Sequence, residues 1–313
     1  MKKLFIVVAM LMILVACSSS SKYTVGVIQL VKHDALDSAT KGFVDTLEAE
    51  FGSDVKVIVN DAQGESANCA AYATSFIADG VNLIMANATP ALQATAHATK
   101  EIPILGTSVT EYGVALEKEV VNHVIGGNVS GTSDLAPLND QAQMIVDLIP
   151  TAKTIGLIYC SAEANSIFQV EEVDKYLKEK GLNTVIMKFS DSNDLHSVAD
   201  TLCSQIDVLY VPTDNTCASN GTIISANAEK YNVPIISGEK ASCIALNGVA
   251  TLSIDYYNLG VETGKMAIKI LKGEADISTM EIGYDNNPEK LYNKKMAEKY
   301  NIVIPSDYKE IGE

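Results

Sequence analysis

The chain alternates short apolar runs with helix-like stretches along most of its length. The apolar runs are continuous and rich in β-branched residues, without alternating polar positions. Such runs are typical of parallel strands that are buried on both faces of a sheet. Because parallel strands must be joined by crossover connections, the pattern predicts an open, doubly wound α/β sheet. In the first part of the chain, we expect strands at 23–30, 55–59, 81–86 and 102–105, with helices at 34–51, 66–78 and 90–99.

The same order of elements begins again after a glycine-rich stretch at 126–131, which suits a hinge. A late helix at 259–271 is expected to return to the first half, and 281–304 to cross back to the second. The fold class is therefore α/β, with two doubly wound parallel-sheet lobes joined by a hinge. The second set of strands is expected at 154–159, 184–189, 208–211, 234–236 and 250–254, with helices at 138–148, 166–180, 195–205 and 221–230.

These crossings predict the division of the chain. Lobe 1 is expected to comprise 23–128 and 255–281, and lobe 2 to comprise 129–254 and 282–313. Because ligands bind outside the carboxyl ends of parallel strands, two facing sheets would share one cleft. Closure of such a cleft about a hinge is a recognised mode of ligand capture.

The N-terminus carries two lysines followed by an uninterrupted apolar run at 4–15. As a helix, this run rises only about 18 Å, too little for a hydrocarbon core of about 30 Å. The run is therefore typical of a signal peptide. The sequence LVAC at 14–17 resembles a bacterial lipobox, in which the cysteine is lipidated; the alternative is a plain secretory signal. We expect a signal peptide at 1–16, lipidation of Cys17, a tether at 17–22, and an extracytoplasmic protein anchored to the membrane.

Composition excludes several classes of protein. Hydrophobic residues make up 47% of the chain, enough for a substantial core, and charged residues make up 20%. The formal net charge of −16 would repel nucleic acid phosphates. No apolar run after the N-terminus is long enough to span a membrane.

Five cysteines follow Cys17, without C-x-x-C spacing. An odd number excludes a complete disulfide framework. We expect small buried thiols, although the sequence leaves open one oxidised pair in an exported protein. The five are Cys69, Cys160, Cys203, Cys217 and Cys243.

The expected strand ends carry mostly uncharged hydrogen-bonding residues. Hydroxyl and amide side chains beside helix N-termini suit a carboxylate. Asp214, an acid among hydroxyls, suits an ammonium group. Any one of these residues would more ordinarily cap a helix, but together they indicate a zwitterion such as an amino acid. The expected ligand contacts are Gln29, His33, Asn87, Thr89, Thr107, Ser108, Asn165, Ser166, Asp214, Asn215, Glu239 and Asp255.

No catalytic motif is present. The chain has no G-x-S-x-G elbow, no P-loop and no G-x-G-x-x-G after the first strand. Its four histidines lie far apart without metal-ligand spacing, so we expect neither a metal nor a cofactor. A repressor of similar architecture would carry a helix-turn-helix where the signal peptide stands.

Several segments together resemble a known family. They read VGVIQLVKHDALDSATKGFVDTL, GTSVT, NVSGTSD, EANS at 163–166, VPTDNTCAS and ATLSIDYYNLGVETGKMAIKILKG, within a resemblance that extends from about Tyr23 to Pro305. The family is that of the tryptophan/tyrosine-type substrate-binding lipoproteins of ABC importers. The resemblance implies a type I periplasmic-binding-protein fold, an amino-acid ligand and permease and ATPase partners.

The resemblance also implies roles for individual residues. The loops at Gln29 and His33 and at 87–89 would enclose the ligand side chain. The α-carboxylate and α-ammonium groups would be held by Ser108, Asn165, Ser166, Asp214 and Asn215.

Three alternatives stay open. The chain has no tryptophan, and the expected loops offer few aromatic residues beyond Tyr112 and Phe168, so another amino acid or a purine nucleoside is possible. A surface sensor or adhesin could use the same cleft, and an exported enzyme could share the scaffold. We expect a monomeric binding protein for an aromatic amino acid, and no enzyme.

Overall fold

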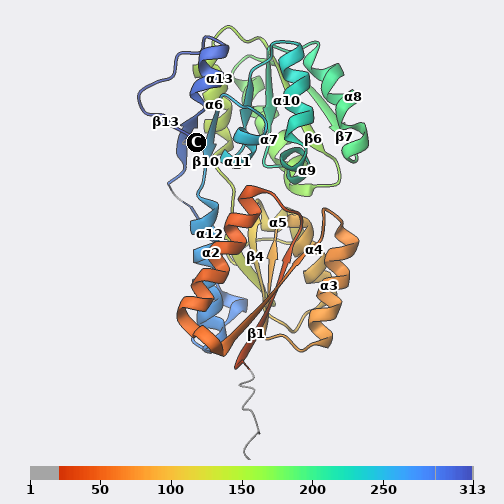
Figure 1. Cartoon of the computed structure of the whole chain (residues 1–313), viewed down its shortest axis with the longest axis vertical. Coiled ribbons are helices and arrows are strands. Elements are labelled where there is room, and N and C mark those ends of the chain that lie inside the picture. Colours follow the sequence, from red (N-terminus) through yellow and green to blue (C-terminus); the bar gives the residue numbers. More distant parts are fainter. Residues whose placement is uncertain (1–20, 286, 312–313) are drawn as a thin grey trace, which may run out of the picture.

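The computed structural model describes residues 21–285 and 287–311, which form two lobes stacked along the long axis of the molecule (Figure 1). The signal peptide expected at 1–16 and the lipidation site expected at Cys17 lie outside the described residues. Within the described ranges, no helix is long and apolar enough to cross a membrane.

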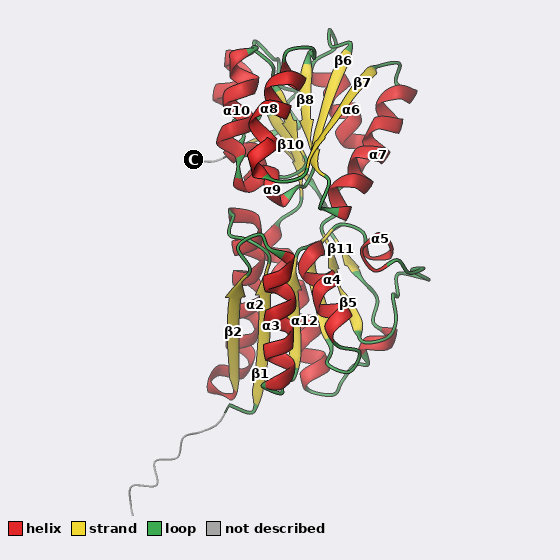
Figure 2. Ribbon diagram, turned by 90° about the vertical axis from the view of Figure 1, so that its right-hand side faces the viewer, coloured by secondary structure: helices red, strands yellow, loops and turns green. Residues whose placement is uncertain are grey.

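Lobe 1 contains a six-stranded parallel sheet in the order β11-β5-β4-β3-β1-β2. Helices α2 and α12 cover one face, and α3 and α4 cover the other (Figure 2). The strands are β1 (Tyr23–Gln29), β2 (Val55–Asp61), β3 (Leu83–Asn87), β4 (Ile104–Val109), β5 (Val129–Ser133) and β11 (Gly283–Tyr284); the helices are α2 (Asp34–Phe51), α3 (Ser66–Ala78), α4 (Thr89–Ala98), α5 (Tyr112–Leu116) and α12 (Tyr256–Leu271), with 3-10 turns at Gly52–Asp54 and Ile277–Thr279.

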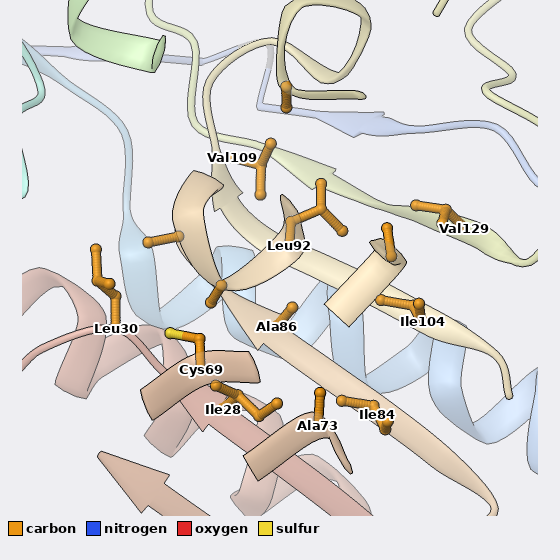
Figure 3. Close-up of a cluster of buried hydrophobic side chains, with 14 of the residues drawn as sticks. Ile28, Leu30, Cys69, Ala73, Ile84, Ala86, Leu92, Ile104, Val109 and Val129 are labelled. Carbon is orange, nitrogen blue, oxygen red and sulfur yellow. The ribbon is translucent and has the colours of Figure 1, made fainter. Parts of the chain in front are cut away.

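The core of lobe 1 explains its unbroken apolar runs. On β1, Val25 and Val27 pack with Phe43 of α2 on one face of the sheet. Ile28 belongs to the cluster on the other face, together with Phe76 and Ala73 of α3. Figure 3 shows part of this cluster, with Ile28 and Ala73 labelled. Because helices cover both faces of the sheet, both sets of side chains along the strand are buried and apolar residues are favoured at every position.

Lobe 2 contains a seven-stranded sheet in the order β13-β12-β10-β9-β8-β6-β7, which is parallel except where β12 pairs antiparallel with β10. Helices α6, α7 and α13 pack on one face, and α8 and α10 pack on the other. The strands are β6 (Thr154–Cys160), β7 (Asn183–Phe189), β8 (Val208–Val211), β9 (Ile235–Ser237), β10 (Ala250–Ser253), β12 (Glu289–Tyr292) and β13 (Lys309–Glu310); the helices are α6 (Leu138–Leu148), α7 (Ala164–Glu179), α8 (Ser192–Cys203), α9 (Asn215–Ser219), α10 (Gly221–Lys230), α11 (Lys240–Ala245) and α13 (Lys294–Lys299).

The prediction of two doubly wound lobes is confirmed, but the lobe boundaries need correction. The glycine-rich stretch expected to be the hinge contains β5, which pairs with β4 in the sheet of lobe 1. Gly131 lies opposite Gly106 with φ +145°, and a Cβ there would come within 2.0 Å of the Gly106 carbonyl oxygen. This glycine serves close strand packing. The chain therefore leaves lobe 1 after Ser133 and again after β11, instead of at 128 and 281.

All five cysteines of the described region are free and buried. Burial raises the pKa of Cys69 and Cys160 to about 11 and that of Cys203 and Cys243 to about 12. These thiols pack as small apolar side chains, as the sequence predicts.

Candidate functional site

A small cavity lies between the lobes, where the carboxyl ends of strands from both sheets meet. Its volume is about 10 Å³, enough for about one water molecule. The cavity is lined by His33, Ala35, Leu36 and Ser108 of lobe 1, by Asp134 and Tyr256 at two of the crossings, and by Asn165, Thr213, Asp214, Asn215, Ala218, Glu239 and Ser242 of lobe 2.

Half of the ligand contacts expected from the sequence line this cavity. They come from both lobes and include Ser108 and Asp214, which therefore share one enclosed space. The six are His33, Ser108, Asn165, Asp214, Asn215 and Glu239. The other six expected contacts lie outside the lining: Gln29, Asn87, Thr89, Thr107, Ser166 and Asp255.

Gln29 and Asn87 form a layer behind the cavity. The Gln29 side chain donates to Asp37 Oδ1 over 2.5 Å and accepts from Thr40 Oγ1 over 2.6 Å. Asn87 Nδ2 donates to the same Thr40 hydroxyl over 2.9 Å and to the Leu36 carbonyl oxygen over 2.8 Å. These bonds tie the start of α2 to the ends of β1 and β3, so the two amides position the helix that contributes Ala35 and Leu36 to the cavity.

Thr107 is also committed to the interior of lobe 1. Its hydroxyl lies 3.2 Å from that of Thr132, which lies 2.8 Å from that of Thr263 on α12. This buried row of threonines links β4, β5 and α12 inside lobe 1. Its sequence position at a strand end could not reveal that the side chain faces inward.

The remaining three expected contacts are Asp255, Ser166 and Thr89, which also lie outside the lining. Asp255 is exposed and caps α12 by accepting from the Asn258 amide over 3.0 Å. Ser166 accepts from Asn165 Nδ2 over 3.2 Å, one residue from the lining. Thr89 is the first residue of α4 and is buried, and its hydroxyl has no hydrogen-bond partner among the described residues.

A larger groove of about 1520 Å³ runs along the hinge side, between α2, α11, α12 and β11 to β13. It is wide and open to solvent, it contains the exposed Asp255, and it shares Ala35, Glu239 and Tyr256 with the small cavity. The enclosed cavity is therefore the better candidate for capture of a small ligand.

Lobe 2 lines the cavity with a network centred on Glu163, a buried residue that the expected contacts omit. Its Oε2 accepts from the Asn215 backbone amide over 3.0 Å and from Asn215 Nδ2 over 2.7 Å. Its Oε1 accepts from the amide and the hydroxyl of Thr216 over 2.9 and 2.8 Å. Asn165 Nδ2 adds a fifth bond over 3.3 Å. Glu163 thus holds the starts of α7 and α9 together.

Asp214, the residue expected to meet an ammonium group, already holds two backbone amides. Its Oδ2 accepts from Cys160 N over 2.7 Å, and its Oδ1 accepts from Cys217 N over 2.8 Å as the cap of α9. Burial, and secondarily the charge of Glu163, raise the pKa of Asp214 to about 7. Asp214 lines the cavity, but its lone pairs mainly organise the loop.

Asp134 is the acid that sequence reasoning missed. It directly follows β5 at the first crossing, and its Oδ2 accepts from the Tyr256 hydroxyl over 2.8 Å. Its Oδ1 has no hydrogen-bond partner among the described residues. Burial raises the pKa of Asp134 to about 6, although the hydrogen bond from Tyr256 opposes this shift. The sequence does not reveal this position, because the preceding segment has the composition of a loop and is predicted to be a hinge.

Four lining residues each present a buried polar atom that no described residue satisfies: Ser108 Oγ, His33 Nδ1, Asp134 Oδ1 and Asn165 Oδ1. Buried polar atoms are nearly always hydrogen-bonded, because an unmade bond costs about 1–3 kcal/mol. Ser108 also has φ +53°, the left-handed region that non-glycine residues rarely adopt. Such strain collects at ligand-binding positions.

The charge of the cavity is one-sided. Its lining includes three carboxyl groups and neither lysine nor arginine, and the whole sequence contains no arginine. A ligand cation would meet acceptors here, whereas a ligand carboxylate would depend on neutral donors such as the Ser108 hydroxyl.

The family model of ABC transporter substrate binding proteins matches residues 24–309, nearly all of the described chain. The chain belongs to this family. This substrate-binding protein is 38% identical over 265 residues to the tyrosine-binding protein of Clostridioides difficile, covering 82% of this chain and 75% of the relative. The family is one of solute-binding proteins, which work with transporter subunits on the extracytoplasmic side of the membrane.

Two solved structures that are similar to this substrate-binding protein superpose on it to different degrees. An ABC domain of Streptococcus pneumoniae in complex with L-Trp is 33% identical and superposes with a TM-score of 0.87, over 93% of this chain and 99% of the other. The ligand-free, open structure of a substrate-binding protein with adhesive properties from Clostridium difficile is also 33% identical, but its TM-score is 0.70, over 92% and 99% of the two chains. At equal identity, the lobes of this substrate-binding protein match the arrangement of the complex better.

Proposed function

We propose that this substrate-binding protein captures an aromatic amino acid, namely tryptophan, tyrosine or phenylalanine, between its lobes and delivers it to the permease and ATPase of an ABC importer. The names of its relatives support this ligand class: one is a tyrosine-binding protein, and another was solved with L-Trp.

One observation carries the proposal: unsatisfied polar atoms of complementary kinds converge on one enclosed cavity. Asp134 Oδ1 and Asn165 Oδ1 are acceptors for an α-ammonium group, and Ser108 Oγ is a donor for an α-carboxylate. Asp134 therefore takes the ammonium role that the sequence suggested for Asp214. Ala35, Leu36 and Ala218, which also line the cavity, supply an apolar surface for the ligand side chain.

Capture requires the lobes to part and close again. A cavity of about 10 Å³ cannot admit an amino acid in this arrangement, so the ligand must enter while the lobes are separated and the lining side chains adjust on closure. Since the unsatisfied atoms belong to both lobes and a crossing, the ligand would favour the closed state through contacts that the open state lacks.

Titration calorimetry tests the proposal directly. L-Tryptophan, L-tyrosine and L-phenylalanine should include at least one ligand that binds in a 1:1 ratio, whereas adenosine should give no heat. Because the chain contains no tryptophan, the fluorescence of added L-tryptophan should shift to the blue as its indole becomes buried. Binding of adenosine without any of the three amino acids would contradict the proposed ligand class.

The proposal includes an anchored, monomeric protein. LVAC at 14–17 supports cleavage before Cys17 and lipidation of that cysteine. In the bacterium, a clickable palmitate analogue should label the wild type and leave the Cys17→Ser variant unlabelled. Labelling of that variant would refute the anchor.

An adhesive role is a second candidate function. It is favoured by the adhesive properties described for the relative from Clostridium difficile. Binding of the purified protein to cultured host cells would support it, and the absence of such binding would leave transport as the sole role proposed.

A further inference from the structure

The only hydrogen bond between His33 and lobe 2 that the structure records joins it to Asn215. His33 Nε2 lies 3.1 Å from Asn215 Oδ1, and 182 positions separate the two residues in the sequence. His33 immediately precedes α2 of lobe 1, and Asn215 begins α9 of lobe 2. The contact therefore exists only while the lobes are closed.

The network around Asn215 determines which ring nitrogen of His33 carries the proton. Asn215 Nδ2 donates to Glu163 Oε2 over 2.7 Å, so the amide nitrogen points toward lobe 2 and Oδ1 points toward the ring. A flipped amide would set its oxygen against a carboxylate oxygen. An amide oxygen is an acceptor, so His33 Nε2 must donate, and in the neutral ring Nδ1 is then left with a lone pair.

The Nδ1 atom is buried in the cavity wall and has no partner in the described chain. The His33 side chain does not cap its own helix, so this nitrogen is not used locally. Nearby in the sequence, Ala35 and Leu36 line the same cavity, and Ala218 follows Asn215 by less than one helical turn of α9. The lone pair therefore belongs to a cavity lining that also contains these three apolar side chains.

We propose that His33 is a specificity-determining residue, whose Nδ1 accepts a hydrogen bond from the side chain of an aromatic ligand. The inference rests on the proposed function and narrows its ligand class to amino acids with a side-chain donor, either a phenol O–H or an indole N–H. Phenylalanine would leave Nδ1 buried without a partner, and that unmade bond lowers affinity. Nε2 meanwhile holds the lobes together through Asn215.

L-Tyrosine and L-phenylalanine form a matched pair of ligands, because they differ by one hydroxyl group. Calorimetry on the wild type should give a dissociation constant at least tenfold lower for L-tyrosine. In His33→Phe, this ratio should fall to within about threefold of one. In Asn215→Ala, both ligands should bind several-fold more weakly while the preference for tyrosine persists. His97→Gln, at an exposed position on α4, serves as the control and should change nothing.

The possible failures are distinguishable. A wild type that binds both ligands equally would overturn the inference without any variant, and so would a His33→Phe variant that keeps the tenfold preference. Both results leave the proposed function intact. A wild type that binds none of the three aromatic amino acids would refute the proposed function, and the inference with it.

Discussion

The two sides of the cavity differ in how their polar groups are satisfied. On the lobe 2 side, the carboxyl groups of Glu163, Asp214 and Glu239 all accept backbone amides at the start of helices α9 and α11. On the side formed by lobe 1 and the first crossing, His33, Ser108 and Asp134 each keep a buried atom without a partner in the described chain. Lobe 2 thus offers a preorganised wall, and the opposite side offers most of the bonds that a ligand can complete.

This difference separates stability from binding. Removing a satisfied acceptor from lobe 2 should cost folding free energy, because several donors lose their partner. Removing an unsatisfied atom from the opposite side should cost affinity and leave the free energy of unfolding nearly unchanged.

The largest effect on stability is expected for Glu163→Gln. An amide cannot accept at both of its ends, so part of the five-bond network would be lost. We expect the free energy of unfolding in urea to fall by about 3 kcal/mol. Glu171→Gln, at an exposed site on α7, is the matched control and should stay within about 0.5 kcal/mol of the wild type. A loss below about 1 kcal/mol for Glu163→Gln would show that the network contributes little to the stability of the fold.

Asp134→Asn should have the largest effect on binding. The neutral amide keeps the shape of the side chain but removes the charge that meets the ligand ammonium group. We expect L-tyrosine to bind about 100-fold more weakly by calorimetry, which corresponds to about 2.7 kcal/mol. Asp140→Asn, at an exposed position in the first turn of α6, provides the comparison and should bind as the wild type does.

The same carboxyl group predicts a pH dependence. Burial raises the pKa of Asp134 from 3.8 to about 6, so the group becomes protonated as the pH falls through 6. Affinity for L-tyrosine should then decrease by up to about tenfold per pH unit below 6. Stability of the ligand-free protein should respond oppositely: the folded state favours the protonated group, so the contribution of Asp134 to stability falls as the pH rises from about 4 to 6. An affinity in Asp134→Asn that still falls across this range would assign the dependence to another group.

Ser108→Ala is expected to have the smallest effect. The backbone keeps its left-handed conformation, and the hydroxyl has no partner among the described residues, so stability should be unchanged within about 0.5 kcal/mol. Binding should weaken about fivefold, because one donor to the ligand carboxylate is lost. Calorimetry and urea unfolding on the same preparation would measure both. A decrease in stability without a decrease in affinity would show that the Ser108 hydroxyl stabilises the fold and does not bind the ligand.

Much of the fold is predictable because burial on both faces leaves a clear signal. The predicted helices at 34–51, 66–78 and 138–148 have the observed bounds. By contrast, β5 contains serine, threonine and glycine, since it lies near the crossings and packs against Gly106. Its composition resembles that of a loop, and only its pairing with β4 reveals a strand.

The site was predictable only in part. The sequence indicates which residues follow strands, and six of the expected contacts do line the cavity. It does not indicate where a side chain points: Thr107 faces the row of threonines, and Gln29 supports α2 from behind. Asp134 follows β5, whose loop-like composition predicts a hinge instead of a strand end. The role of Glu163 depends on contacts with residues about 50 positions away in the sequence.

Thermal unfolding of Asp134→Asn with and without saturating L-tyrosine tests the central claim most directly, because one experiment reports both stability and binding. The ligand-free melting temperature should equal or exceed that of the wild type, since a buried carboxyl group is replaced by a neutral one, and most of the rise in melting temperature caused by L-tyrosine should disappear. An undiminished rise would contradict the claim that the open acceptor of Asp134 binds the ligand.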